Sequence, residues 1–207
     1  MSKFFYPLID NPYRKKDINK AIEVLKSFKI TSGIKTINFQ NSFKKKFRLN
    51  NALMVNSGSS ANLLALQCLI NPYRKKRLKR GDEILIPSLC WSTSLWPIIQ
   101  SGLKPKFVDI EKTTLNIDLA DLKSKITKKT KGILIVHVLG NSTNMNELMK
   151  IKKKYNLYLI EDTCESLGTK FKNKYLGSFG EFSSFSFYSS HQISSGEGGM
   201  ICCKHQE

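Results

Sequence analysis

One histidine, His191, stands in a polar loop with the sequence SSHQISSGEGGM. Imidazole has an ordinary pKa near neutrality, so a histidine in such a setting can take up and release protons during a reaction. A lone histidine is more often structural than catalytic, but core packing is a poor explanation for one surrounded by serine and glutamine. The other two histidines, His137 at a strand end and His205 near the terminus, have no comparable setting.

A second candidate is Asp162, which ends the apolar run LYLIED. In open α/β sheets, ligands bind at the carboxyl ends of strands. A carboxylate there can pair with the protonated nitrogen of a heterocyclic ring. The alternative is a solvated loop acid or a helix cap.

The stretch NSGSSAN, residues 56–62, lies between a predicted strand and a predicted helix. Gly58 lets the backbone approach an anion, serines such as Ser59 supply donors, and the helix start offers free N–H groups. Phosphate binding is one interpretation, and an ordinary serine N-cap is the other. Trp91 follows another strand and could stack on a planar ring, or else plug the core or anchor an interface.

Short apolar runs alternate with helical patterns along the chain, which predicts an α/β fold with a mainly parallel sheet covered on both faces. The predicted strands are 52–55, 83–86, 106–108, 132–137, 158–161, 183–186 and 200–202. The predicted helices are 17–27, 60–70, 93–101, 119–125 and 146–154. This arrangement would bring the polar motifs to the carboxyl ends of strands.

Composition narrows the classes of protein. With 207 residues, 41% apolar, the chain has the profile of an ordinary globular protein, and no apolar run is long enough to span a membrane. The amino terminus has too short an apolar stretch for a signal peptide, so we expect a cytoplasmic protein. Five cysteines lack the spacing of a metal site, and we predict no metal. The net charge of +18 is spread over helix faces without aromatic interleaving, so we predict no nucleic-acid partner.

These motifs together resemble the DegT/DnrJ/EryC1/StrS family of fold-type I enzymes that use pyridoxal phosphate (PLP) on nucleotide sugars. The resemblance covers nearly the whole chain. The segments that carry it are VNSGSSANLLAL, RGDEILIPSLCWSTS, HVLGN, IEDTCESLG, GSFGEFSSFSFY and GEGGM. It implies the three-layer α/β/α large domain of that family, over residues 31–207, after an amino-terminal segment and helix in residues 1–30.

The resemblance also implies a role for each matched residue. Gly58, Ser59 and Ser186 would bind the coenzyme phosphate. Trp91 would cover the ring, Asp162 would pair with the pyridine nitrogen, and Glu165 would line the side of the ring that carries the 3′-oxygen. His191 occupies the place of the family's PLP-binding lysine, and no lysine lies between Lys174 and Lys204. PLP or its amine form, pyridoxamine phosphate (PMP), would therefore be held without a covalent bond, and His191 would be the acid/base.

Within the family, histidine at this position is typical of dehydratases that make 3-deoxysugars for surface polysaccharides such as the lipopolysaccharide O-antigen. The coenzyme would take an amino group from glutamate, and the C3 hydroxyl of a nucleotide-linked 4-keto-6-deoxyhexose would be expelled. The segment CWSTS favours GDP-4-keto-6-deoxymannose over a CDP-sugar, whose enzymes add an iron–sulfur cluster. The alternatives are a nucleotide-sugar aminotransferase and an inactive family member that only binds.

Family members are about twice as long as this chain, act as homodimers and carry a small carboxy-terminal domain that is absent here. We therefore expect residues 1–207 alone to expose a large apolar face and to be poorly soluble or inactive.

Overall fold

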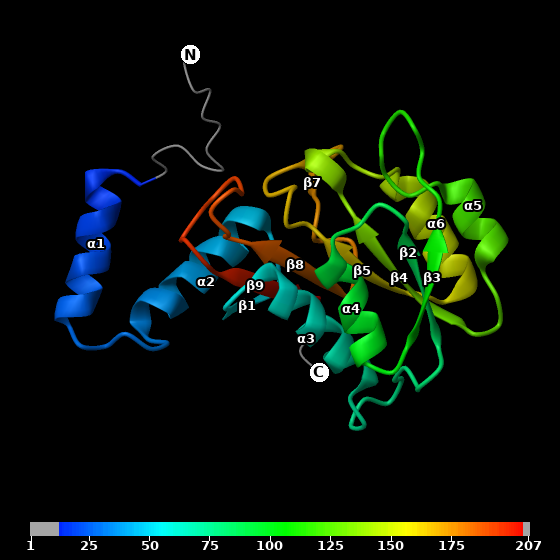
Figure 1. Ribbon diagram of the computed structural model, residues 1–207, viewed down its shortest axis with the longest axis horizontal. Helices are drawn as coiled ribbons and strands as arrows, with labels where there is room; N and C mark the ends of the chain where they lie inside the picture. Colours follow the sequence, from blue (N-terminus) through cyan, green and yellow to red (C-terminus); the bar gives the residue numbers. More distant parts are fainter. Residues whose placement is uncertain (1–12, 205–207) are drawn as a thin grey trace, which may run out of the picture.

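A computed structural model describes residues 13–204, which form one large sheet with helices on both faces (Figure 1). The helices are α1 (Lys15–Lys26), α2 (Ile34–Phe47), α3 (Gly58–Ile70), α4 (Ser92–Gln100), α5 (Leu119–Lys125) and α6 (Met145–Tyr155), with a 3-10 turn η1 (Val138–Gly140). The strands are β1 (Asn51–Val55), β2 (Glu83–Pro87), β3 (Lys104–Val108), β4 (Thr130–Val136), β5 (Tyr158–Asp162), β6 (Lys170–Phe171), β7 (Lys174–Tyr175), β8 (Phe182–Ser186) and β9 (Gly199–Cys203). Each predicted helix and strand is present, with ends shifted by no more than two residues.

The seven-stranded sheet has the order β1-β9-β8-β5-β4-β2-β3. Neighbours from β8 to β3 are parallel, whereas β9 runs antiparallel to both β8 and β1. The prediction of a mainly parallel α/β sheet is therefore confirmed. Because β9 is antiparallel to both of its neighbours, β1 runs in the same direction as β8. The carboxyl ends of β1, β8, β5, β4 and β2 therefore all lie at the same edge of the sheet.

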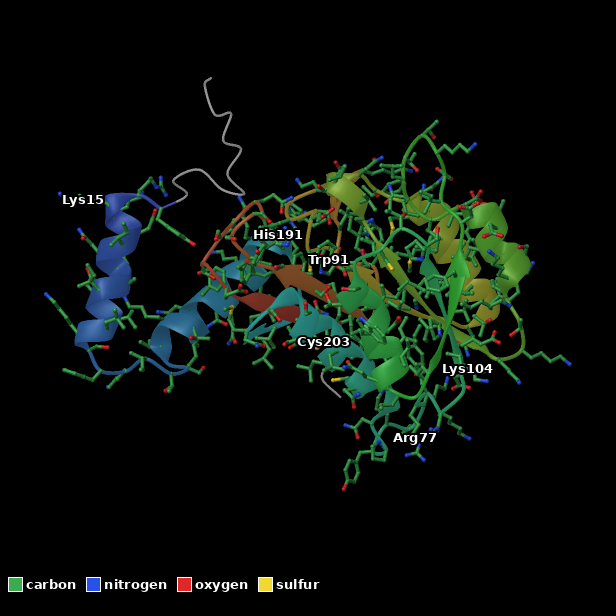
Figure 2. The ribbon with its side chains drawn as sticks, viewed as in Figure 1. Lys15, Arg77, Trp91, Lys104, His191 and Cys203 are labelled. Atoms are coloured by element: carbon green, nitrogen blue, oxygen red, sulfur yellow. The ribbon has the colours of Figure 1, made fainter. Side chains whose placement is uncertain are left out.

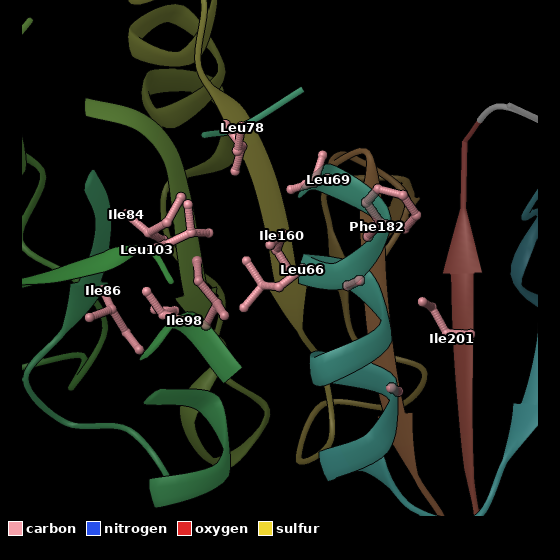
Figure 3. Close-up of a cluster of buried hydrophobic side chains, with 13 residues drawn as sticks. Leu66, Leu69, Leu78, Ile84, Ile86, Ile98, Leu103, Ile160, Phe182 and Ile201 are labelled. Atoms are coloured by element: carbon pink, nitrogen blue, oxygen red, sulfur yellow. The ribbon is translucent and has the colours of Figure 1, made fainter. Parts of the chain in front are cut away.

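Two apolar layers flank the sheet, as the runs that are apolar on both faces predict. On one face, α3 and α4 pack against alternate residues of the strands, for example Leu66 against Ile160 and its neighbours (Figure 3). On the other face, α5 and α6 cover the parallel strands, and Leu122 and Leu148 belong to that core. The result is the expected three-layer arrangement.

Helix α2 has no counterpart in the sequence prediction. Its carboxy-terminal turn is rich in lysine and its apolar periodicity is weak, so the pattern did not indicate a helix. Phe43 and Phe47, one turn apart, nevertheless pack against Phe185 of β8 with ring centroids 5.0 and 6.3 Å away. Aromatic burial against the sheet fixes a helix that sequence propensity alone does not predict.

Helix α1 lies at the far end of the molecule (Figure 1) and buries none of its residues. The division of the chain at residue 30 stays a prediction, and residues 1–12 lie outside the described part. No helix within residues 13–204 combines the length and the apolar character needed to cross a membrane.

Candidate functional site

Asp162 is the centre of a hydrogen-bond network at the carboxyl end of β5. Its side chain is buried, with the residue 5% exposed. Asn62 Nδ2 donates to Asp162 Oδ2 over 2.8 Å, and Ser94 Oγ donates to the same oxygen over 2.7 Å. The other oxygen, Oδ1, accepts the N–H of Cys164 at 3.2 Å. These three donors fix the orientation of the carboxylate at the end of β5.

The start of α3 lies next to this carboxylate. Ser57 is the N-cap, and its Oγ accepts the N–H of Ser60 at 3.1 Å. The capping interpretation thus applies to Ser57, whereas the first-turn N–H groups that follow, at Gly58 and Ser59, have no acceptor within the helix. Such a helix start is suited to an anion such as phosphate. Ser59 Oγ also donates to Thr93 Oγ1 over 2.8 Å, which ties α3 to α4.

Gly58 is a point of close packing between three segments. A Cβ at this position would lie 2.6 Å from Cys164 Sγ and 2.9 Å from Ser186 Cβ. Only glycine therefore allows α3 to begin directly over the ends of β5 and β8. Ser186 itself is buried at the end of β8, and its Oγ accepts the N–H of Tyr188 at 3.2 Å.

Trp91 precedes α4 and is 73% exposed, so it is not a core plug in the described residues. The neighbouring Cys90 reports on its surroundings, because burial and then the negative charge of Asp162 raise the pKa of its thiol. Trp91 is thus placed near the Asp162 edge of the sheet, with its indole free to cover a ligand.

His191 lies in the loop beyond β8, partly exposed (Figure 2). The His191 N–H donates to Tyr188 O at 3.0 Å, which closes a turn in the loop. The His191 ring contacts the Tyr188 ring edge-on, with centroids 6.0 Å apart. The next residue, Gln192, donates from Nε2 to the carbonyl oxygen of Glu165 over 2.6 Å. That bond connects the His191 loop to the segment that follows Asp162.

Glu165 is held from the opposite side as well. Its Oε2 accepts the N–H of Leu139 at 3.0 Å, from the turn that follows β4. Gly140 approaches the same residue, since a Cβ there would lie 3.6 Å from Glu165 O.

The structure therefore brings the predicted residues to one edge of the sheet. Direct contacts join Gly58 to Ser186 and connect Ser59 to the α4 turn that also carries Ser94. His191, Trp91 and Glu165 are brought to this edge through neighbouring residues, and in the described chain no hydrogen bond connects their side chains to Asp162.

No role was predicted for Asn62 or Ser94 from the sequence. Both stand among apolar residues on helices that cover the sheet, and both are buried. A buried polar side chain requires a partner, so an asparagine in the run SSANLLAL is the signal that could have found this network.

A second missed feature is the buried pair of Glu161 and His137, both fully inaccessible. The Glu161 carboxylate accepts the N–H groups of Gly177, Phe179 and Gly180 at 2.7 to 2.8 Å, and His137 Nε2 lies 3.4 Å away. His137 thus has a buried structural setting, which its position at a strand end did not reveal. His205 lies outside the described residues.

The donor set fits a flat, phosphorylated, nitrogen-containing ring such as PLP. The free N–H groups at the α3 start suit a phosphate, the Asp162 carboxylate suits a ring nitrogen, and the Trp91 indole suits a ring face. Asn62 Oδ1 is buried and has no hydrogen-bond partner within residues 13–204. The same described residues contain no group of three histidine, cysteine or acidic side chains placed to hold a metal.

Comparison with known proteins gives the family. Residues 12–207 match the DegT/DnrJ/EryC1/StrS aminotransferase family. The chain belongs to this family. It is 43% identical over 202 residues to a GDP-4-keto-6-deoxy-D-mannose 3-dehydratase of Escherichia coli O55:H7. The aligned region covers 98% of this chain and 52% of that protein.

Solved structures give the same relationship. The E. coli GDP-4-keto-6-deoxy-D-mannose-3-dehydratase with bound hydrated PLP superposes with a TM-score of 0.93 at 42% identity, over 98% of this chain and 52% of that one. A GDP-4-keto-6-deoxymannose-3-dehydratase with a trapped PLP–glutamate adduct superposes with a TM-score of 0.94, at the same identity and coverage. The chain thus spans about half the length of the relatives it matches.

Proposed function

We propose that this chain is the coenzyme-binding part of a PLP-dependent dehydratase that removes the C3 hydroxyl of a nucleotide-linked 4-keto-6-deoxyhexose. The observation that carries the proposal is His191, which lies in a segment that has no lysine between Lys174 and Lys204, beside the residues expected to bind the coenzyme. GDP-4-keto-6-deoxymannose is the favoured substrate, supported by the names of the similar proteins. Glutamate is the amino donor.

When bound, the coenzyme would supply an electron sink, which allows the C3 hydroxyl to leave from the sugar carbon next to the C4 ketone. Asp162, fixed by Asn62 and Ser94, would hold the ring nitrogen protonated, which the sink requires. The N–H groups at Gly58 and Ser59, together with the Ser186 hydroxyl, would bind the phosphate. Trp91 would cover the ring face, and Glu165 would face the 3′-oxygen.

His191 would move the proton at C4′ of the coenzyme. An imidazole can accept and then donate a proton, which suits this role. A lysine in that place would also bind PLP covalently and return it for another transamination. Histidine would move the proton but could not bind the coenzyme covalently, which favours dehydration over amino transfer.

Other properties of the protein follow as proposals of the same kind. Cys68, Cys90, Cys164 and Cys202 are free thiols, which suits a reducing compartment, and we place the protein in the cytoplasm. We propose a homodimer as the working assembly, and surface polysaccharide as the destination of the 3-deoxysugar.

The decisive experiment incubates the purified full-length gene product with PLP, glutamate and GDP-4-keto-6-deoxymannose. Release of ammonia with a 3-deoxy product is the expected result. A stable 4-amino sugar would instead make the protein an aminotransferase, and absence of both turnover and PLP binding would leave a protein without this activity.

Borohydride provides a matched control on the role of His191. Wild-type protein with PLP and no substrate should not be trapped covalently, whereas His191→Lys should be, because a lysine amine at that place reaches the coenzyme. Covalent trapping in the wild type would contradict the proposal. His191→Asn should keep PLP affinity within about two-fold and lose nearly all dehydration, by about 10²-fold or more.

A further inference from the structure

Three loops that follow adjacent parallel strands meet at Glu165. Leu139 belongs to the loop after β4, Glu165 to the loop after β5, and Gln192 to the loop after β8, and these strands are neighbours in the order β8-β5-β4. Leu139 N–H donates to the Glu165 carboxylate at 3.0 Å, while Gln192 Nε2 donates to the Glu165 carbonyl oxygen at 2.6 Å. Glu165 is thus bound through both its side chain and its backbone.

The two contacts differ in what holds them. Leu139 has a φ of 51°, a conformation that is unfavourable for a residue with a Cβ, so its N–H direction is imposed by the surrounding fold. Gln192 is exposed and reaches the Glu165 carbonyl through the end of its side chain. The Gln192 contact therefore depends on a side-chain amide, whereas the Leu139 contact depends on the backbone.

The remaining hydrogen bonds of the His191 loop do not connect it to the Asp162 edge. They join residues within the loop and its stem, such as His191 N–H to Tyr188 O and Ser195 N–H to Phe187 O, both at 3.0 Å. One further bond links Ser194 Oγ to the Tyr13 hydroxyl at 3.1 Å, towards the amino-terminal segment. Among residues 13–204, the hydrogen bond from the Gln192 amide to the Glu165 carbonyl is the one that connects this loop to the segment after β5.

We propose that Gln192 is a positioning residue, whose amide sets the location of the neighbouring imidazole of His191 relative to the coenzyme edge. The proposal rests on the function proposed above. Adjacent residues share one backbone, so a bond at the Gln192 side chain restrains the Cα of His191 at a distance of a few bonds. Proton transfer depends strongly on such placement, whereas coenzyme affinity depends on the α3 start and Asp162.

Three variants test the role. Gln192→Met keeps the length of the side chain and removes the donor. Gln192→His restores an N–H donor at a similar reach from the backbone. Gln67→Met is the matched control, because Gln67 on α3 donates Nε2 to Ser101 Oγ at 3.1 Å, in a part of the fold that does not contact the site.

The first measurement needs neither coenzyme nor activity. Hydrogen–deuterium exchange of the peptide covering residues 187–196 should be about five-fold faster in Gln192→Met than in wild type, from loss of one hydrogen bond, and near wild-type in Gln192→His and Gln67→Met. Unchanged exchange in Gln192→Met would overturn the proposal, whether or not the protein proves to be a dehydratase.

The second measurement separates positioning from general structure. In Gln192→Met we expect kcat to fall about ten-fold, with KM for the sugar nucleotide and the Kd for PLP within about two-fold of wild type. Gln192→His should recover most of the loss. A faster loop with unchanged kcat, or an equal loss of PLP affinity, would contradict a positioning role. An inactive wild type would instead refute the proposed function and leave the exchange result to stand alone.

Discussion

Glu161 and Asp162 are consecutive residues of β5 whose carboxylates face opposite sides of the sheet. Glu161 is fully buried, and both of its oxygens accept backbone N–H groups from the turn at Gly177–Gly180. Asp162 receives two side-chain donors on Oδ2, and Oδ1 accepts one backbone N–H at 3.2 Å.

The two carboxylates differ in the kind of donor that holds them and therefore in what they stabilise. Backbone donors can be satisfied in only one chain geometry, so Glu161 determines how the chain enters β8. Side-chain donors can shift with little cost to the fold, and a carboxylate held by them keeps acceptor capacity for a ligand at the open edge. Adjacent acids of equal burial can therefore serve stability and chemistry separately.

The largest effect on stability is expected for Glu161→Ala. Three backbone N–H groups, two of them buried and one partly buried, would lose their acceptor, and we expect the free energy of unfolding to fall by about 3–6 kcal/mol. Urea-induced unfolding followed by circular dichroism measures it. A loss below about 1.5 kcal/mol would show that the turn finds other acceptors, and would remove the contrast with Asp162.

Asp162→Asn should give the reverse profile. The amide has almost the same size and retains an oxygen for Asn62 or Ser94, so the free energy of unfolding should fall by no more than about 2 kcal/mol. Affinity for PLP should fall about 30-fold, because a charged hydrogen bond to the ring nitrogen is lost. Titration of PLP followed by absorbance gives the affinity. Wild-type affinity in this variant would mean that Asp162 does not contact the ring.

Smaller effects are expected for Asn62→Ala and Ser94→Ala. Each removes one of two donors to Asp162 Oδ2, and we expect a loss of about 1 kcal/mol in unfolding free energy and about five-fold in PLP affinity. The double variant should lose more than the sum, since the second removal leaves that oxygen without a donor. Strict additivity in the two measurements would indicate that the two donors act independently of each other.

The smallest effect concerns pH. Burial, together with the negative charge of Asp162, raises the pKa of the Cys164 thiol well above its ordinary value. The unfolded chain therefore releases this proton first, so the stabilisation is complete at neutral pH and declines above about pH 9. The thiol should contribute a loss of about 0.8 kcal/mol between pH 7 and pH 9.5. Cys164→Ala should show a shallower decline in urea unfolding over this range, and an identical slope would contradict the assignment.

Much of the fold was predictable because its strands are apolar runs bounded by turn residues. Helix α2 was not, since Phe43 and Phe47 find their partners on β8, far along the chain. The antiparallel placement of β9 was not predictable either, because strand direction depends on pairing partners that the sequence does not state.

The site divides in the same way. Asp162 and the Gly58 turn could be found because they follow strands, and strand ends meet at one edge. Asn62 and Ser94 could not be assigned because their partner is a carboxylate on another element. Gln192 could not be assigned either, because its partner is the backbone carbonyl oxygen of Glu165, and a backbone oxygen leaves no signal in the sequence.

The close contact at Gly199 has a consequence for biosynthesis. A Cβ at Gly199 would lie 2.6 Å from the nitrogen of Gly58, so the start of α3 is completed by a residue from the opposite end of the described chain. During synthesis on the ribosome, α3 emerges early but its amino-terminal turn stays open until β9 has been made and inserted between β1 and β8. The phosphate end of the site should therefore be among the last parts of this sheet to form, and a nascent chain stopped before β9 should have no place for the coenzyme.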